Sequence, residues 1–116
     1  MVTVTVARGT RGIDGITVEG HAGYRARGKD IVCAAASTLA YAAAGALEEI
    51  AGLAGCHEHS GGFFSITVPL GIDDDARRVA DTVLRTACVG YRQIAASYPK
   101  RLRVRYAMES ISNGGD

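Results

Sequence analysis

The sequence predicts a single α+β domain in which two helices pack on a mostly antiparallel, four-stranded sheet. Short stretches that alternate apolar and polar residues, such as Val and Thr at 2–7, are typical of half-buried strands. Two longer stretches, 32–50 and 76–98, repeat apolar residues three and four positions apart, which is the spacing of one helix face. In chain order the elements read ββαβαβ, so helices and strands do not alternate regularly and an α+β fold is expected.

The first two strands are predicted to form a hairpin. The alternating stretch 2–7 is followed by the turn cluster 8–12 and by a β-favouring stretch at 13–19. The run Gly9-Thr10-Arg11-Gly12 also matches the G-x-x-G loop of an RNA-binding module. Because that loop joins two helices, we interpret the match as chance.

A loop with three glycines, 20–30, leads to the first helix. Asp30 is placed to cap this helix, since its carboxylate can accept hydrogen bonds from the amides of the first turn. Many alanines in the apolar stripe allow close packing against a sheet, and Gly52 and Gly55 end the helix. The stripe consists of Val32, Ala35, Ala36, Leu39, Ala43, Ala46, Leu47 and Ile50.

The second half of the chain begins with a predicted polar turn at 56–62. This segment contains Cys56-His57-Glu58-His59, but adjacent side chains seldom converge on one ion, so we expect no metal site. A strand at 64–68 follows, and the next helix begins at three aspartates, 73–75, where negative charge suits the helix dipole. Pro99 stops that helix after an apolar stripe that runs to Tyr98.

The last predicted strand alternates Leu102, Val104 and Tyr106 with arginines, and it completes a domain that spans 1–107. Residues 108–116 are expected to be a disordered tail. The arginines are Arg101, Arg103 and Arg105.

Composition narrows the classes of function. The 116 residues are 47% hydrophobic and 22% charged, and the net charge of +1 gives no reason to expect direct nucleic-acid or membrane binding. We expect no signal peptide, and no apolar run approaches the roughly 20 residues that a membrane span needs. Three cysteines without framework spacing favour a reducing compartment, so a cytoplasmic location is expected.

One cysteine occupies a position that suits a nucleophile. Cys33 lies in the first turn of the predicted helix, where the amide dipoles favour thiolate over thiol. The same amides, that of Cys33 included, are natural donors to a tetrahedral oxyanion. The plainer interpretation, a small buried hydrophobe at a helix start, also fits the residues.

His21 is the candidate base for this thiol. A loop that returns to the helix start brings its imidazole to Cys33, where it can take the thiol proton and later protonate a leaving amine. An exposed loop histidine is the alternative. Asp30 either caps the helix or orients the imidazole, and Ser37 either faces a substrate or bonds a helix carbonyl.

Two runs of residues resemble the signature of the bacterial ribosomal-processing cysteine protease family. They are Gly20-His21-Ala22-Gly23-Tyr24 and Gly28-Lys29-Asp30-Ile31-Val32-Cys33-Ala34-Ala35-Ala36-Ser37, which follow the pattern G-H-A-G … G-x-D-I-V-C-A-A-x-S. A looser similarity includes the Val/Thr opening strand, the acidic start of the second helix, and Gln93-Ile94 before Tyr98-Pro99. It extends to about residue 107.

The resemblance implies a homodimeric cysteine endopeptidase without a cofactor. Its substrate would be a ribosomal protein precursor, large-subunit protein twenty-seven, whose short N-terminal extension is cut after an aromatic residue. The family's nucleophile falls on Cys33 and its histidine on His21, with Asp30 and Ser37 at motif positions beside them. The segment 22–29 matches a flexible loop that orders on substrate binding. The matching motif glycines are Gly20, Gly23 and Gly28.

The sequence also allows two functions other than a protease. A non-enzymatic ribosome- or RNA-associated module would bind through Arg101, Arg103 and Arg105, although a solvated edge strand explains these arginines as well. A thiol-transfer protein would be expected to carry a C-x-x-C pair, and the sequence has none.

Overall fold

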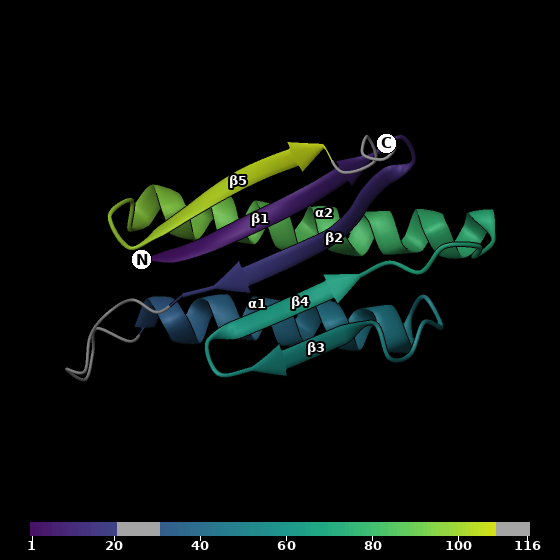
Figure 1. The fold of residues 1–116 in the computed structure, drawn as a ribbon, viewed down its shortest axis with the longest axis horizontal. Coiled ribbons are helices and arrows are strands. Elements are labelled where there is room, and N and C mark those ends of the chain that lie inside the picture. Colours follow the sequence, from purple (N-terminus) through teal and green to yellow (C-terminus); the bar gives the residue numbers. More distant parts are fainter. Residues whose placement is uncertain (21–30, 109–116) are drawn as a thin grey trace.

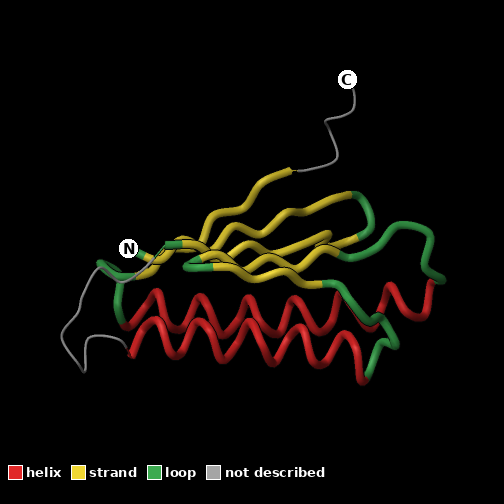
Figure 2. Tube along the Cα trace, turned by 60° about the horizontal axis from the view of Figure 1, so that its bottom comes forward, coloured by secondary structure: helices red, strands yellow, loops and turns green. Residues whose placement is uncertain are grey.

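Five strands and two helices make up the described part of the chain, residues 1–20 and 31–108 of a computed structural model. The strands form one sheet, and both helices lie side by side on one face of it (Figure 1, Figure 2). The predicted α+β class with a two-helix layer is therefore confirmed. The elements are β1 (Val2–Gly9), β2 (Gly12–Glu19), α1 (Ile31–Glu49), β3 (His57–Ser60), β4 (Phe63–Thr67), α2 (Asp74–Ser97) and β5 (Leu102–Met108).

The sheet has the strand order β3-β4-β2-β1-β5, so β3 and β5 are its edges. The pairing of β1 with β5 is parallel, and the other three pairings are antiparallel. The sheet is mostly antiparallel, as predicted, but the predicted number of four strands is wrong. The fifth strand is β3, which lies in the segment 56–62, and the prediction of a polar turn there is wrong as well.

β3 lacks a strand pattern because all four of its residues are exposed. It pairs with β4 through a turn at Gly61 and Gly62, and Gly62 has a φ of +76°, which glycine adopts without strain. The ring of His57 stacks on Phe64 of β4 with 5.4 Å between centroids. A neighbouring strand and its aromatic side chain thus hold β3 in place, in a way that its own periodicity does not reveal.

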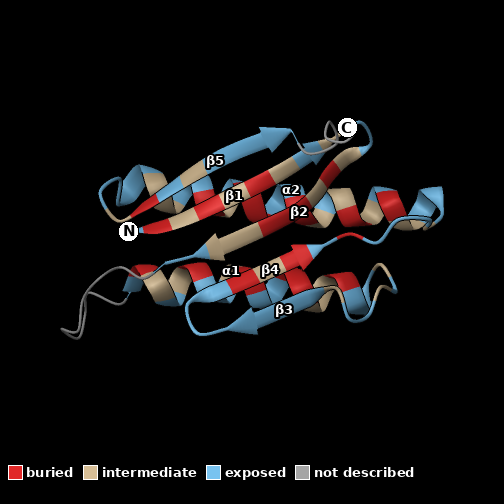
Figure 3. Ribbon diagram, in the orientation of Figure 1, coloured by how far each residue is buried: buried red, intermediate tan, exposed pale blue. Residues whose placement is uncertain are grey.

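β1 and β2 form the predicted hairpin. Val2, Val4 and Val6 are at most 2% exposed and belong to the core, while the threonines between them are half-buried, so burial alternates along β1 (Figure 3). The G-x-x-G run joins two strands through a short turn, which excludes a helix-joining RNA-binding loop at this position. β5 ends at Met108, and residues 109–116 lie outside the described part.

The two helices begin and end close to their predicted positions. Asp73 caps α2, because its carboxylate accepts the amide of Ala76 at 2.8 Å, and two further aspartates lie in the first turn. Each predicted stripe is too long at its C-terminal end: Ile50 is 68% exposed and Tyr98 is 40% exposed. Both residues follow the last residue of their helix and therefore leave the buried face.

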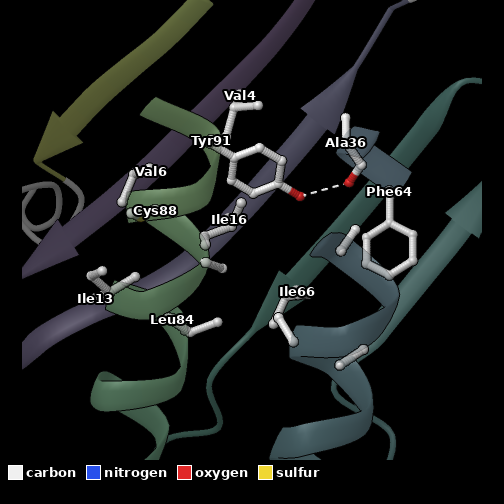
Figure 4. Packing of buried hydrophobic residues seen from close by; sticks show 14 of the residues in the cluster. Val4, Val6, Ile13, Ile16, Ala36, Phe64, Ile66, Leu84, Cys88 and Tyr91 are labelled. Carbon is white, nitrogen blue, oxygen red and sulfur yellow. Dashed lines mark hydrogen bonds between the residues drawn. The ribbon is translucent and has the colours of Figure 1, made fainter. Parts of the chain in front are cut away.

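Side chains from both helices and from β1, β2, β4 and β5 form one core (Figure 4). Tyr91 of α2 is 1% exposed, and its hydroxyl donates to the carbonyl of Ala36 in α1 at 3.0 Å. Burial raises the pKa of Tyr91 because a phenolate would lose its hydration there. The two helices are therefore tied together through a neutral tyrosine.

One charged residue of the described part is buried, and the spacing of apolar residues in α2 does not predict this burial. Arg77 of α2 pairs with Asp14 at 2.7 Å and donates to the carbonyls of Ile13 and Arg11, each at 3.2 Å. Its guanidinium thus fixes the β1–β2 hairpin against α2. Such a buried charge is tolerated because its donors are used by nearby acceptors.

Among the described helices, only α1 is long and apolar enough to cross a membrane, judged by length and composition. This differs from the expectation that no segment of the chain could span a bilayer. Core helices of soluble proteins pass the same test. Six of the 19 residues of α1 are buried in the core, so one face of this helix packs against the rest of the domain.

Candidate active site

Cys33 is the third residue of α1 and is half-buried. It lines a hollow of about 240 Å³ between the beginning of α1, the end of β2 and the β3–β4 hairpin, which we call the Cys33 hollow. The residues that line the Cys33 hollow include Gly20, Cys33, Ser37, Tyr41, His59, Gly62, Phe63 and Phe64. The candidate nucleophile therefore borders a concave surface, although its side chain also packs against the core.

Ser37 lines the same hollow one turn after Cys33. Thr38, the next residue, is the one that donates its hydroxyl to a helix carbonyl, that of Ala34 at 2.8 Å. Both interpretations of Ser37 stay predictions, and its position places it on the hollow beside Cys33.

Aromatic side chains form one wall of the Cys33 hollow. The ring of Tyr41 meets Phe64 edge-on at 5.0 Å and His59 edge-on at 5.8 Å between centroids. These contacts bring α1, β3 and β4 together around the hollow. Such a wall suits an apolar or aromatic side chain of a bound peptide.

Gly20 sets the path of the chain as it leaves β2 toward position 21. Its φ is +94°, and a Cβ at this position would lie 2.5 Å from the carbonyl oxygen of Met1. Its amide donates to the carbonyl of Gly62 at 3.0 Å, which ties the end of β2 to the β3–β4 turn. A glycine is therefore needed here on steric grounds, directly before the candidate base.

The structure brings together three of the predicted site residues, namely Gly20, Cys33 and Ser37. His21, Asp30, Gly23 and Gly28 lie outside the described residues, as does the loop 22–29. The pairing of His21 with Cys33 and the two roles of Asp30 therefore stay predictions.

Several residues of the hollow escape prediction from the sequence. Tyr41 reads as an exposed helix residue, His59 as part of a polar turn, and Phe63 as the residue before a strand. The sequence does contain one signal, because Gly61-Gly62 between two short runs is a hairpin signature. That hairpin is what carries His59 and Phe63 to the beginning of α1.

The other two cysteines lie in less reactive places. Cys88 is 2% exposed in the core, and burial raises the pKa of its thiol. Burial also raises the pKa of Cys56, whose sulfur lies 3.6 Å from the carbonyl of Leu53. Within residues 1–20 and 31–108, no three His, Cys, Asp or Glu side chains are grouped so as to hold a metal ion.

Known proteins match this chain over most of its length. The family model described as cysteine protease Prp matches residues 1–103. The ribosomal processing cysteine protease Prp of Bacillus subtilis is 29% identical over 107 residues, which are 90% of this chain and 96% of that protein.

Solved structures agree with this match. A Streptococcus mutans protein has a TM-score of 0.81 at 25% identity, with 94% of this chain and 96% of that chain covered. An essential ribosomal processing protease Prp from S. aureus, in complex with a covalently linked product peptide, has a TM-score of 0.73 at 28% identity, with 91% and 99% covered. This chain therefore belongs to the cysteine protease Prp family and is a cysteine protease.

Proposed function

We propose that this chain is an endopeptidase in which Cys33 is the nucleophile and His21 is the general base and acid. One observation carries the proposal: Cys33 lies in the first turn of α1 and faces an aromatic-walled hollow beside Gly20, the residue before His21. At this position the sulfur lies beside the amide end of α1, where an oxyanion formed during acyl transfer would find hydrogen-bond donors.

The reaction begins when the His21 imidazole takes the thiol proton. The Cys33 sulfur then bonds to the scissile carbonyl carbon, and amides at the start of α1 stabilise the oxyanion. The carbon–nitrogen bond breaks as the imidazolium protonates the leaving amine, which leaves a thioester. Water, deprotonated by His21, attacks the thioester carbonyl and releases the acid, and the sulfur recovers its proton.

The remaining motif residues support these two. Asp30 caps α1 or orients the His21 ring, and the Ser37 hydroxyl faces the bound peptide. The loop 22–29, with Gly23 and Gly28, closes over the peptide when it binds.

The substrate we propose is a ribosomal protein precursor, large-subunit protein twenty-seven, whose N-terminal extension is removed after an aromatic residue. Two facts support this choice. The Bacillus subtilis relative is a ribosomal processing protease, and the S. aureus relative has been crystallised with a substrate peptide. The exposed rings of Tyr41 and Phe63 in the hollow offer stacking surface to an aromatic side chain before the scissile bond. Homodimerisation and a cytoplasmic location belong to the same proposal.

A peptide that spans the extension junction of the precursor from the same organism tests the mechanism. Mass spectrometry should detect a single cut after the aromatic residue, no turnover by Cys33→Ala, and a loss of about a thousandfold in His21→Gln. His59→Gln is the matched control, because His59 lines the Cys33 hollow but has no assigned proton transfer. Turnover by Cys33→Ala would refute the nucleophile, and a greater loss in His59→Gln than in His21→Gln would refute the base.

Labelling tests the activated thiol without a substrate. Iodoacetamide at neutral pH should modify Cys33 faster than Cys56 or Cys88, since Cys33 faces a hollow and burial raises the pKa of the other two thiols. Equal labelling rates for Cys33 and Cys56 would contradict an activated nucleophile at position 33.

A further inference from the structure

A second hollow, larger than the first, lies at the other edge of the sheet. Its volume is about 390 Å³, and it is enclosed by α2, the ends of β1 and β5, and the start of β2. In Figure 1, α2, β1 and β5 lie on the β5 side of the sheet, whereas α1, β3 and β4, which line the Cys33 hollow together with the end of β2, lie on the β3 side. The residues that matter for its chemistry are Arg8, Asp81, Arg85, Cys88, Arg92 and Tyr106, and we call it the Tyr106 hollow.

Two arginines hold Tyr106 from different directions. The guanidinium carbon of Arg8 lies 4.8 Å from the centre of the Tyr106 ring, and Arg92 donates to the Tyr106 hydroxyl at 2.9 Å. Because that hydroxyl acts as an acceptor toward Arg92, its own proton is available to a further acceptor. β1, α2 and β5 each contribute one of these three side chains, so the arrangement is held by three separate elements.

The positive charge in the Tyr106 hollow exceeds the negative charge. Within residues 1–20 and 31–108, the ion pairs shorter than 4.0 Å involve neither Arg8 nor Arg92. Asp81 faces the hollow but already accepts the amide of Ile13 at 2.8 Å and pairs with Arg85 at 3.5 Å. Among the residues that the structure describes, Arg8 and Arg92 therefore have a neutral partner in Tyr106 and no paired carboxylate.

The field of these arginines extends to the inner wall of the Tyr106 hollow. Burial raises the pKa of the Cys88 thiol, the charges of Arg92 and Arg8 oppose that rise, and the charge of Asp81 makes a smaller contribution that adds to it. Two guanidinium groups on different elements thus act on the same buried sulfur. A ligand in the hollow would meet both charges at once.

We propose that the Tyr106 hollow binds the phosphate group of a ligand. A phosphate dianion balances the two guanidinium charges of Arg8 and Arg92, and its several oxygens can accept from both forks and from the Tyr106 hydroxyl. The volume has room for a group attached to the phosphate. A mononucleotide carries such a dianion on one phosphate, whereas a single-stranded RNA backbone would supply the same charge from two neighbouring phosphodiesters, so the test contains both.

The proposal concerns a site separate from the protease chemistry, and its test needs no peptide cleavage. Isothermal titration calorimetry of the full chain with AMP, with adenosine and with a short oligoadenylate separates phosphate recognition from base stacking. We expect saturable binding of AMP, of the oligoadenylate, or of both, and none of adenosine. Preference for AMP indicates a small ligand, and a steep loss of oligoadenylate affinity with salt indicates an RNA backbone.

Four variants locate the site. Arg8→Gln and Arg92→Gln should each weaken phosphate binding about tenfold or more, because each removes a charged hydrogen bond to the anion. Arg105→Gln changes β5 on the opposite face of the sheet, and Arg78→Gln changes an exposed α2 residue paired with Asp75, so both should bind as the parent does.

Three results would overturn the proposal. The first is that AMP and the oligoadenylate bind no better than adenosine. The second is that Arg8→Gln and Arg92→Gln leave phosphate binding unchanged while circular dichroism shows them folded. The third is that Arg105→Gln alone abolishes binding, which would move the site to the open face of the sheet.

Discussion

Replacement of Gly20 by alanine should destabilise the protein and impair the active site together. A side chain at a φ of +94° costs about 1–3 kcal/mol in backbone strain. The new Cβ would also lie 2.5 Å from the Met1 carbonyl oxygen, a backbone atom that cannot rotate away. Relief of this clash would disturb the 3.0 Å bond from the Gly20 amide to the Gly62 carbonyl, worth about 1 kcal/mol. Together we expect a loss of about 2–4 kcal/mol in the free energy of unfolding.

Gly52→Ala is the matched control for this experiment. Gly52 has a φ of +73°, but nothing lies within 4 Å of the position of its Cβ, so only the conformational cost applies, about 1 kcal/mol. Urea unfolding followed by circular dichroism measures both variants. The difference between them reports the close approach of Gly20 to Met1 together with its higher φ and its bond to Gly62.

Cleavage of the precursor peptide should separate the same two variants. Gly20→Ala redirects the chain immediately before His21, so its kcat/KM should fall about tenfold or more, while Gly52→Ala should keep the activity of the parent. The reasoning would be refuted if Gly20→Ala were no less stable than Gly52→Ala, or if it were less stable but fully active.

Three further outcomes follow from the described contacts. Arg77→Met should lower the free energy of unfolding by about 3 kcal/mol, because it leaves the partners of a buried guanidinium unpaired. The control Arg78→Met, at an ion pair whose arginine is 70% exposed, should change the free energy of unfolding by less than about 0.5 kcal/mol. Equal losses for the two variants in urea unfolding would contradict this prediction. The folded-state pKa values of Tyr91 and Cys88 are raised above the ordinary 10.0 and 9.0, so the stability that these groups contribute is present below pH 9 and is lost as the pH rises beyond it. The thermal unfolding midpoint should therefore fall between pH 9 and pH 11, and it should fall less in Tyr91→Phe. An unchanged midpoint would contradict the burial of these two groups in their neutral forms. Tyr41→Ala should raise KM for the precursor peptide about tenfold with a smaller change in kcat, since it removes part of the wall of the Cys33 hollow. A loss confined to kcat would assign Tyr41 another role.

Most of the fold could be predicted because most elements carry their burial pattern along their own length. The valines of β1 alternate in sequence and in burial, and the Asp73 cap is local to α2. β3 could not be found this way, since its four residues are exposed and it depends on β4. The parallel pairing of β1 with β5 is likewise a property of the assembled sheet.

The candidate site shows the same division. Cys33 and Ser37 lie one helical turn apart, so a local motif places both on one stretch of α1. Tyr41 and His59 come together only after the β3–β4 hairpin has folded against α1. The burial of Arg77 cannot be predicted from its own segment for a related reason. Its carbonyl and carboxylate partners lie more than sixty positions earlier in the chain.

The parallel partnership of β1 and β5 also has a consequence for biosynthesis. Val2 pairs with Leu102, so a strand near the beginning of the chain gains its last neighbour only when residues about a hundred positions later have been made. Contacts this distant in sequence slow folding and leave the growing chain with an unprotected Val/Thr edge in the meantime. A chain truncated before Leu102 would keep that edge permanently, as a ready template for aggregation.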